Sequence, residues 1–110
     1  GDPAAVSLAV NDILSQVPEE LFIQGNYPNP FNPVTTIRFG LPESRRVSLT
    51  IVNMLGQEVA ELLNSWKDLG HHEIRWQSLD NQGVPVASGV YFAVLRDGNS
   101  IDIRKMMLLK

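Results

Sequence analysis

The stretch Asn26-Tyr27-Pro28-Asn29-Pro30-Phe31-Asn32-Pro33 decides how the rest of this chain can fold. Proline fixes φ, donates no backbone hydrogen bond and disfavours helix at the residue before it. The stretch can therefore form neither a helix nor a central strand. Because a flexible linker would seldom carry Tyr27 and Phe31, we expect a rigid arm. Its two aromatic side chains should pack against the domain, while Asn29 and Asn32 stabilise turns.

The arm also coincides with a change of sequence pattern, which sets the predicted domain boundary. Residues 26–110 have the pattern of one β domain, whereas residues 1–25 have that of a helix followed by a linker. With 110 residues, of which 44% are hydrophobic and 19% charged, the chain can bury the core of one globular domain. Because it starts at Gly1 rather than Met, we expect it to be the C-terminal part of a larger parent protein.

The predicted N-terminal helix spans residues 3–16. Asp2 and Pro3 suit the cap and the first position of a helix. Five apolar residues then recur at helical spacing: Val6, Val10, Ile13, Leu14 and Val17. This apolar stripe either packs on the β domain or belongs to the tail of a preceding domain. The acidic link Pro18-Glu19-Glu20 has the character of a spacer and favours the second interpretation.

Alternation of apolar and polar residues predicts about seven short strands. The pattern is clearest in residues 35–41, where Ile37, Phe39 and Leu41 share one face, and in residues 46–53. The other predicted strands are residues 21–23 at an edge, 58–63 as a strand or a short helical turn, 70–76, 90–95 and 101–109. With turn signals roughly every ten residues, the pattern predicts an all-β fold. We expect an immunoglobulin-like antiparallel β-sandwich, preceded by the short N-terminal helix.

Short signals within this region carry further predictions. Gly56 should supply a positive φ in a tight turn, and Asp97-Gly98-Asn99 should close a hairpin. The strands at 35–41 and 46–53 should form either a hairpin or a pair across the two sheets. Residues 90–95 are apolar at every position, so we expect a central strand that is covered on both faces. Trp76 should fill the space between the sheets that a disulfide occupies in antibody domains.

Composition excludes several classes of function. The net charge of −3 comes from residues 1–20, which hold four acidic and no basic residues. The remaining nine basic and eight acidic residues leave 9 − 8 = +1, so the β domain has no strong field for nucleic acid. There is no cysteine, which excludes disulfides and thiolate sites, and no apolar run reaches the ~18 residues of a membrane-spanning helix.

Candidate catalytic and metal-binding patterns are weak. Adjacent His71 and His72 would point to opposite faces of a strand and cannot chelate one metal together. Asp80-Asn81-Gln82-Gly83 lacks the spaced acidic positions of a calcium loop, so we interpret it as a turn and leave a weak oxygen-ligand site open. Ser44 and Ser88 have no base nearby in the sequence. We therefore expect a non-catalytic chain with no cofactor and no metal site.

Several motifs, in a fixed order, resemble one protein family, the C-terminal sorting domains of type IX secretion cargo. The matching stretches are the arm at 26–33, Thr35-Thr36-Ile37-Arg38-Phe39, residues 47–51, Leu55-Gly56-Gln57-Glu58-Val59, Pro85-Val86-Ala87-Ser88-Gly89-Val90-Tyr91-Phe92 and Lys105-Met106-Met107-Leu108-Leu109-Lys110. The likeness covers about residues 26–110. The domain is also similar to the immunoglobulin-like part of flagellar hook-capping proteins, but the Asn-Pro arm favours the sorting family.

The resemblance implies a role and a set of partners. Such domains direct large secreted enzymes or adhesins of Bacteroidetes-like bacteria across the outer membrane, and are often cleaved off as the cargo is attached to the cell surface. The implied partners are the outer-membrane secretion machinery, its processing enzyme and an upstream catalytic or adhesive domain. The implied recognition signal is the last strand, residues 105–110, and the implied location is secreted or on the outer cell surface.

Physical reasoning supplies a mechanism for recognition and leaves alternatives open. A terminal strand with unpaired backbone groups can accept a strand from a partner, with Lys105 and Lys110 bracketing the apolar residues between them. Residues 106–109 can equally be ordinary core. A homodimer through a strand edge or the N-terminal helix is a further prediction. A structural or carbohydrate-binding accessory module of a glycan-degrading enzyme is the alternative function, which exposed aromatic residues such as Trp66 would serve.

Overall fold

The computed structural model describes residue 18 and residues 20–110, which form seven strands and no helix. The helix predicted over residues 3–16 lies outside the described residues. The strands are β1 (Phe22–Tyr27), β2 (Thr35–Leu41), β3 (Arg45–Val52), β4 (Glu58–Lys67), β5 (Gly70–Trp76), β6 (Gly89–Arg96) and β7 (Ile101–Leu108). The prediction of an all-β fold is confirmed. Within the described part of the chain, nothing forms a helix of the length and apolarity needed to cross a membrane.

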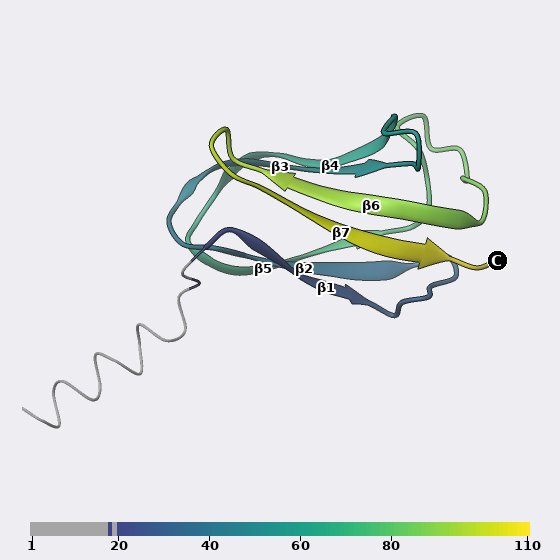
Figure 1. Ribbon diagram of the computed structural model, residues 1–110, viewed down its shortest axis with the longest axis horizontal. Helices are drawn as coiled ribbons and strands as arrows, with labels where there is room; N and C mark the ends of the chain where they lie inside the picture. The colour runs from purple at the N-terminus through teal and green to yellow at the C-terminus, as the bar shows by residue number, and fades with distance from the viewer. Residues whose placement is uncertain (1–17, 19) are drawn as a thin grey trace, which may run out of the picture.

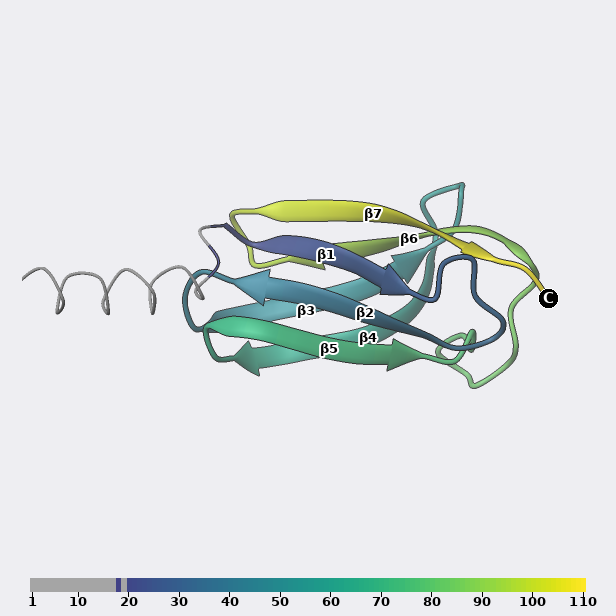
Figure 2. The same cartoon turned by 90° about the horizontal axis from the view of Figure 1, so that it is seen from below.

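The strands form two antiparallel sheets that lie one above the other (Figure 1). One sheet has the order β1-β2-β5 and the other the order β4-β3-β6-β7. Of the two pairings that the sequence allowed for β2 and β3, the structure has the cross-sheet one, because the two strands lie in different sheets. Figure 2 shows the three-stranded sheet in front of the four-stranded one, with β7 along the rim.

Side chains from the inner faces of both sheets make a single core. The alternation predicted for β2 and β3 is confirmed, since their inward apolar residues are fully buried. The buried apolar residues of this core are Leu21, Ile23, Phe31, Ile37, Phe39, Leu41, Val47, Leu49, Ile51, Ala60, Trp76, Tyr91, Ala93, Leu95, Met106 and Leu108. Leu21 and Ile23 precede the predicted domain start at Asn26, and β1 itself begins at Phe22.

Aromatic residues fill the end of the core beneath the arm. Trp76 is buried, with its ring centroid 5.7 Å from that of Phe31 and 5.4 Å from that of Tyr91. Its indole Nε1 donates a hydrogen bond to the Leu79 carbonyl at 2.9 Å, so the only polar atom of the ring is satisfied. Trp76 thus occupies the space between the sheets, as predicted.

The outer face of β6 differs from expectation. Val90 and Phe92 are only half-buried, and within the described part of the chain no second layer covers this face. Val94 is buried there because the strand lies in the middle of its sheet, between β3 and β7. The prediction of cover on both faces is therefore wrong. A run that is apolar at every position does not require two covering layers when neighbouring side chains on the same face shield its centre.

Candidate functional site

The predicted recognition segment, residues 105–110, is divided between core and surface. Met106 and Leu108 point inward and are buried, whereas Lys105, Leu109 and Lys110 are exposed. This division follows from strand geometry, because successive side chains of β7 point to opposite faces of the sheet. Only part of the segment can therefore be read directly by a partner.

The outer edge of β7 is paired by the arm at its C-terminal end. Phe31 forms a parallel bridge with Leu108. The Phe31 N–H donates to the Met107 carbonyl and the Leu109 N–H donates to the Phe31 carbonyl, both at 3.0 Å. The Met107 N–H donates to the side-chain oxygen of Asn29 at 3.0 Å. The arm thus leaves the sheet of β1 and joins the sheet of β7, which closes this part of the edge.

The path of the arm is set by polar contacts at its start and by one apolar anchor. Asn26 Nδ2 donates to the Thr35 hydroxyl at 3.1 Å, and that hydroxyl donates to the Pro28 carbonyl at 2.8 Å. Phe31 is 2% exposed and packs on Trp76. The Tyr27-Pro28, Asn29-Pro30 and Asn32-Pro33 peptide bonds are cis. The hydrogen bonds of Asn26 and Thr35 and the packing of Phe31 make the arm an ordered part of the domain rather than a linker.

The predictions for the aromatic and asparagine side chains of the arm are only partly confirmed. Phe31 packs against the domain, but Tyr27 is 79% exposed, so that part of the prediction is wrong. Tyr27 pairs with Thr36, and paired residues point to the same face, which for Thr36 is the outer face of the sheet. Asn29 bonds to the terminal strand rather than to a local turn, and Asn32 is exposed.

The last residue is tied to the loop before β6. The Lys110 N–H donates to the Ser88 hydroxyl at 2.9 Å, and its ammonium group donates to the Val86 carbonyl. Ser88 comes directly before Gly89, the first residue of β6, so both ends of the β6–β7 hairpin meet here. The exposed Lys110 is consequently held in place by two contacts, one to the exposed Ser88 and one to the partly buried Val86.

The opposite end of the β6–β7 hairpin is organised by Asp97. Its Oδ1 accepts hydrogen bonds from the backbone N–H groups of Asn99 at 2.9 Å and Ser100 at 2.7 Å, which confirms the predicted turn. Its Oδ2 accepts from the guanidinium of Arg45, which also pairs with Glu43. The Asp97 side chain is 1% exposed, so this is a buried charge with a paired cation. Sequence reasoning missed Arg45, since no local pattern links residues 52 positions apart.

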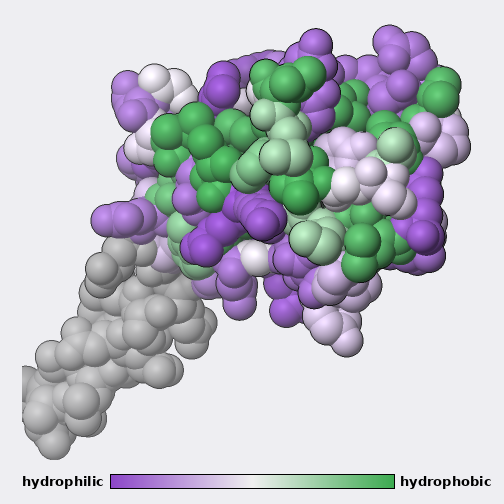
Figure 3. Space-filling model, turned by 45° about the vertical axis from the view of Figure 1, so that its right-hand side comes forward, coloured by the Kyte–Doolittle hydropathy of each residue, from purple (hydrophilic) through white to green (hydrophobic). Residues whose placement is uncertain are grey.

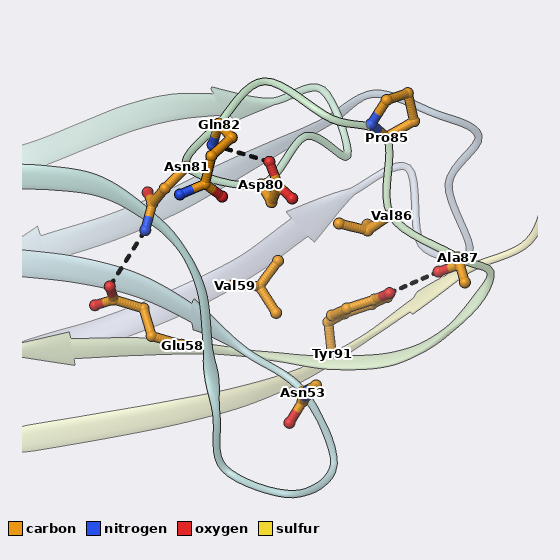
Figure 4. Close-up of a pocket in the computed structure, with 10 residues that line it drawn as sticks. All are labelled: Asn53, Glu58, Val59, Asp80, Asn81, Gln82, Pro85, Val86, Ala87 and Tyr91. Carbon is orange, nitrogen blue, oxygen red and sulfur yellow. Dashed lines mark hydrogen bonds between the residues drawn. The ribbon is translucent and has the colours of Figure 1, made fainter.

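A surface cavity of about 490 Å³ lies beside Tyr91, between the β3–β4 turn and the loop that follows β5 (Figure 4). Asp80 Oδ1 accepts hydrogen bonds from the N–H groups of Gln82 and Val84, both at 2.9 Å, which stabilises the turn predicted there. Asn81 Oδ1 accepts from the Glu61 N–H at 2.8 Å. The oxygen-ligand site left open at residues 80–83 therefore has these two oxygens bonded to backbone amides. The described residues hold no group of three or more His, Asp or Glu side chains placed to bind a metal ion.

Tyr91 and Gly56 lie in stretches that resemble the family, and the structure gives each of them a structural position. The Tyr91 hydroxyl donates to the Ala87 carbonyl at 2.6 Å, and burial raises the pKa of that hydroxyl. Gly56 has a φ of 78°, as predicted for its turn. His71 and His72 point to opposite faces of β5, and His72 stacks on Phe39 with ring centroids 5.3 Å apart.

Comparison with known proteins gives the family. The model of the secretion system C-terminal sorting domain matches residues 26–109. The chain therefore belongs to this family of type IX secretion sorting domains.

Solved structures with the same fold occur in much longer proteins. A dimeric latent PorU from Porphyromonas gingivalis matches with a TM-score of 0.62 and 22% identity, covering 76% of this chain and 9% of that one. PorZ, a surface component of the type IX secretion system of the same bacterium, matches with a TM-score of 0.52 and 21% identity, covering 82% of this chain and 11% of that one. Comparison with curated proteins gave no match.

Proposed function

We propose that this chain is the non-catalytic sorting and anchoring module of a larger secreted protein. In this proposal it is recognised by the outer-membrane type IX machinery and cut by a processing enzyme, while the parent protein is released or attached at the cell surface. The family match over residues 26–109 is the observation that carries the proposal. The ordered terminal strand supports it, because a recognition element on a fixed edge can be read by its shape and backbone.

The test is export of a reporter fused in front of the full 110-residue chain in a type IX host. We expect the fusion protein in the medium or on the cell surface, and the reporter alone inside the cell. Deleting residues 105–110 would also remove Met106 and Leu108 from the core, so loss of export would not separate a lost signal from a lost fold. The triple variant Lys105→Ser, Leu109→Ser and Lys110→Ser changes exposed residues only, so its export tests the recognition signal without removing side chains from the core. Failure of the unaltered fusion to leave the cell would refute the sorting function.

An immunoglobulin-like topology is the finer proposal for the fold. Two sheets of three and four antiparallel strands support it, and so does Tyr91. In immunoglobulin-like domains a tyrosine near the start of the sixth strand bonds back to the backbone a few residues upstream, as the Tyr91 hydroxyl does to Ala87. We also propose that the folded unit starts near Leu21 rather than at Asn26, since Leu21 and Ile23 belong to the core.

The carbohydrate-binding alternative gains little from the placement of aromatic residues. Trp76 and Tyr91 are buried, and Trp66 and Tyr27 are exposed on strands of different sheets. Glycan-binding modules of that kind present exposed aromatic rings together on one surface. The homodimer remains a prediction.

A further inference from the structure

The edge of β7 is closed by the arm only at its C-terminal end. In an antiparallel pair, alternate residues direct their backbone groups toward the partner strand, and the others direct them away. Met107 directs its N–H and carbonyl away from β6, toward the arm. By the same alternation Lys105, Ile103 and Ile101 present their backbone groups on that outer edge. Figure 2 shows the arm reaching β7 only near the end of the strand.

The backbone of Lys105 has no hydrogen-bond partner on this edge among the described residues. The backbone N–H of Ile103 already has a partner, because it donates to Asp102 Oδ1 at 3.0 Å. The other oxygen of that side chain, Asp102 Oδ2, accepts from the Ile23 N–H at 2.7 Å. The row of edge bonds that the arm makes to Met107 and Leu109 therefore stops at Lys105. A strand laid along residues 101–105 would continue that row.

Side chains along the open part of the edge define what would fit there. Ile101 and Ile103 are 55% and 52% exposed on the outer face, next to Lys105. Arg96 pairs with Ile101 and is exposed on the same face, whereas Arg104 is exposed on the opposite side of the strand, with its Nε 3.9 Å from Asp102 Oδ2. On the face that Figure 3 shows, apolar groups are interrupted by strongly hydrophilic ones. The outer face of this part of the edge is therefore apolar at Ile101 and Ile103, with the basic side chains of Arg96 and Lys105 beside them.

We propose that an extended segment of a partner protein adds as a strand to β7 at residues 101–105, and that this segment carries apolar side chains and carboxylates. The inference rests on the proposed sorting function and names how the terminal strand would be read. It moves the backbone contact upstream of residues 106–110, whose outer edge the arm occupies. Apolar side chains of the partner would cover Ile101 and Ile103, and its carboxylates would face Lys105 and Arg96.

The deciding variant is Lys105→Pro in the full chain fused to the reporter. Proline removes the outward N–H and places its ring on the edge, but bonds to β6 are retained because they use the neighbouring residues. Lys105→Gln is the matched control, since it removes only the charge. We expect roughly ten-fold or greater loss of export for Lys105→Pro and a smaller loss for Lys105→Gln. If the wild-type fusion is exported and the folded Lys105→Pro variant is exported equally well, strand addition at β7 is wrong, but the sorting function is not contradicted.

Three further measurements keep the inference testable if Lys105→Pro does not fold, as judged by circular dichroism. In amide hydrogen exchange of the full chain, the backbone N–H of Lys105 should exchange quickly and that of Met107 slowly. Equal protection of the two N–H groups would show that the edge is not open at Lys105 and would overturn the proposal. Lys105→Glu should export less than Lys105→Gln, and no difference would overturn the acidic partner. Sedimentation of the wild-type chain tests whether a second copy of this chain binds the edge of β7 instead of a partner protein. A dimer that Lys105→Glu abolishes would assign the edge to self-association and overturn the proposal.

Discussion

The side-chain oxygen of Asn29 accepts a hydrogen bond from the backbone N–H of Met107 at 3.0 Å, across 78 positions of sequence. An asparagine side chain here does what a neighbouring strand would do, and it lies next to the bonds that Phe31 makes to the same edge. The arm and the terminal strand are therefore one structural unit. Any partner that binds the edge of the last strand at Met107 would therefore also contact the arm.

Asn29→Ala should destabilise the domain by about 0.5–1.5 kcal/mol, because the Met107 N–H loses its acceptor. Asn32→Ala is the matched control, since Asn32 is exposed, and should change stability by about 0.5 kcal/mol or less. Chemical denaturation of both variants measures the difference. Equal stability of the two variants would contradict the assigned role of Asn29.

Phe31→Ala should cost about 3–5 kcal/mol, because it leaves a cavity beside Trp76. Tyr27→Ala, the other aromatic residue of the arm, should stay within about 0.5 kcal/mol of the wild type because its ring is exposed. Thermal unfolding followed by tryptophan fluorescence compares them. A larger loss for Tyr27→Ala than for Phe31→Ala would mean that the arm is placed incorrectly.

Asp97→Ala should destabilise the domain more than Asp97→Asn. The asparagine variant keeps an acceptor for the N–H groups of Asn99 and Ser100 and loses only the charge that faces Arg45. We expect a cost of roughly 1.5–3 kcal/mol for Asp97→Asn, since a charge-assisted bond is lost and Arg45 keeps Glu43 as a second partner. Urea denaturation gives both values. Identical losses would contradict the role assigned to the bonds from Asn99 and Ser100, because only the acceptor for those bonds distinguishes the two variants.

Tyr91→Phe should cost about 0.5–1.5 kcal/mol near neutral pH, since the bond to the Ala87 carbonyl is lost. The raised pKa of Tyr91 means that the folded state favours the neutral hydroxyl. This contribution to stability is fully present below the ordinary tyrosine pKa of 10.0 and is lost as pH rises through the folded pKa. The difference in unfolding free energy between wild type and Tyr91→Phe should therefore narrow above pH 10. A constant difference up to pH 11.5 would contradict the burial of the hydroxyl.

Compared with removing residues 1–20, removing residues 1–25 should destabilise the fold by several kcal/mol more. The second truncation deletes Leu21 and Ile23 from the core, each worth roughly 2–5 kcal/mol as a buried side chain. Circular dichroism melting curves of the two shortened chains test this. Equal melting temperatures would return the domain start to Asn26.

Local pattern was sufficient for most of the strands and for their inward faces. The alternation in β2 and β3 and the turn at Asp97 follow from residues a few positions apart, and the structure agrees with both. The prediction that the aromatic residues of the arm pack against the domain holds for Phe31 and fails for Tyr27. The family could likewise be inferred from short motifs in a fixed order, which the match over residues 26–109 confirms.

Tertiary structure alone decided which groups meet across long stretches of chain. The bond from Met107 to Asn29, the Arg45–Asp97 pair and the placement of β2 and β3 in different sheets depend on how the two sheets close over one core. Periodicity states which face of a strand is apolar, but not which edge lies beside which segment, because edge pairing depends on backbone groups that every residue carries. For that reason the open part of the β7 edge, at residues 101–105, could be found only once the position of the arm was known.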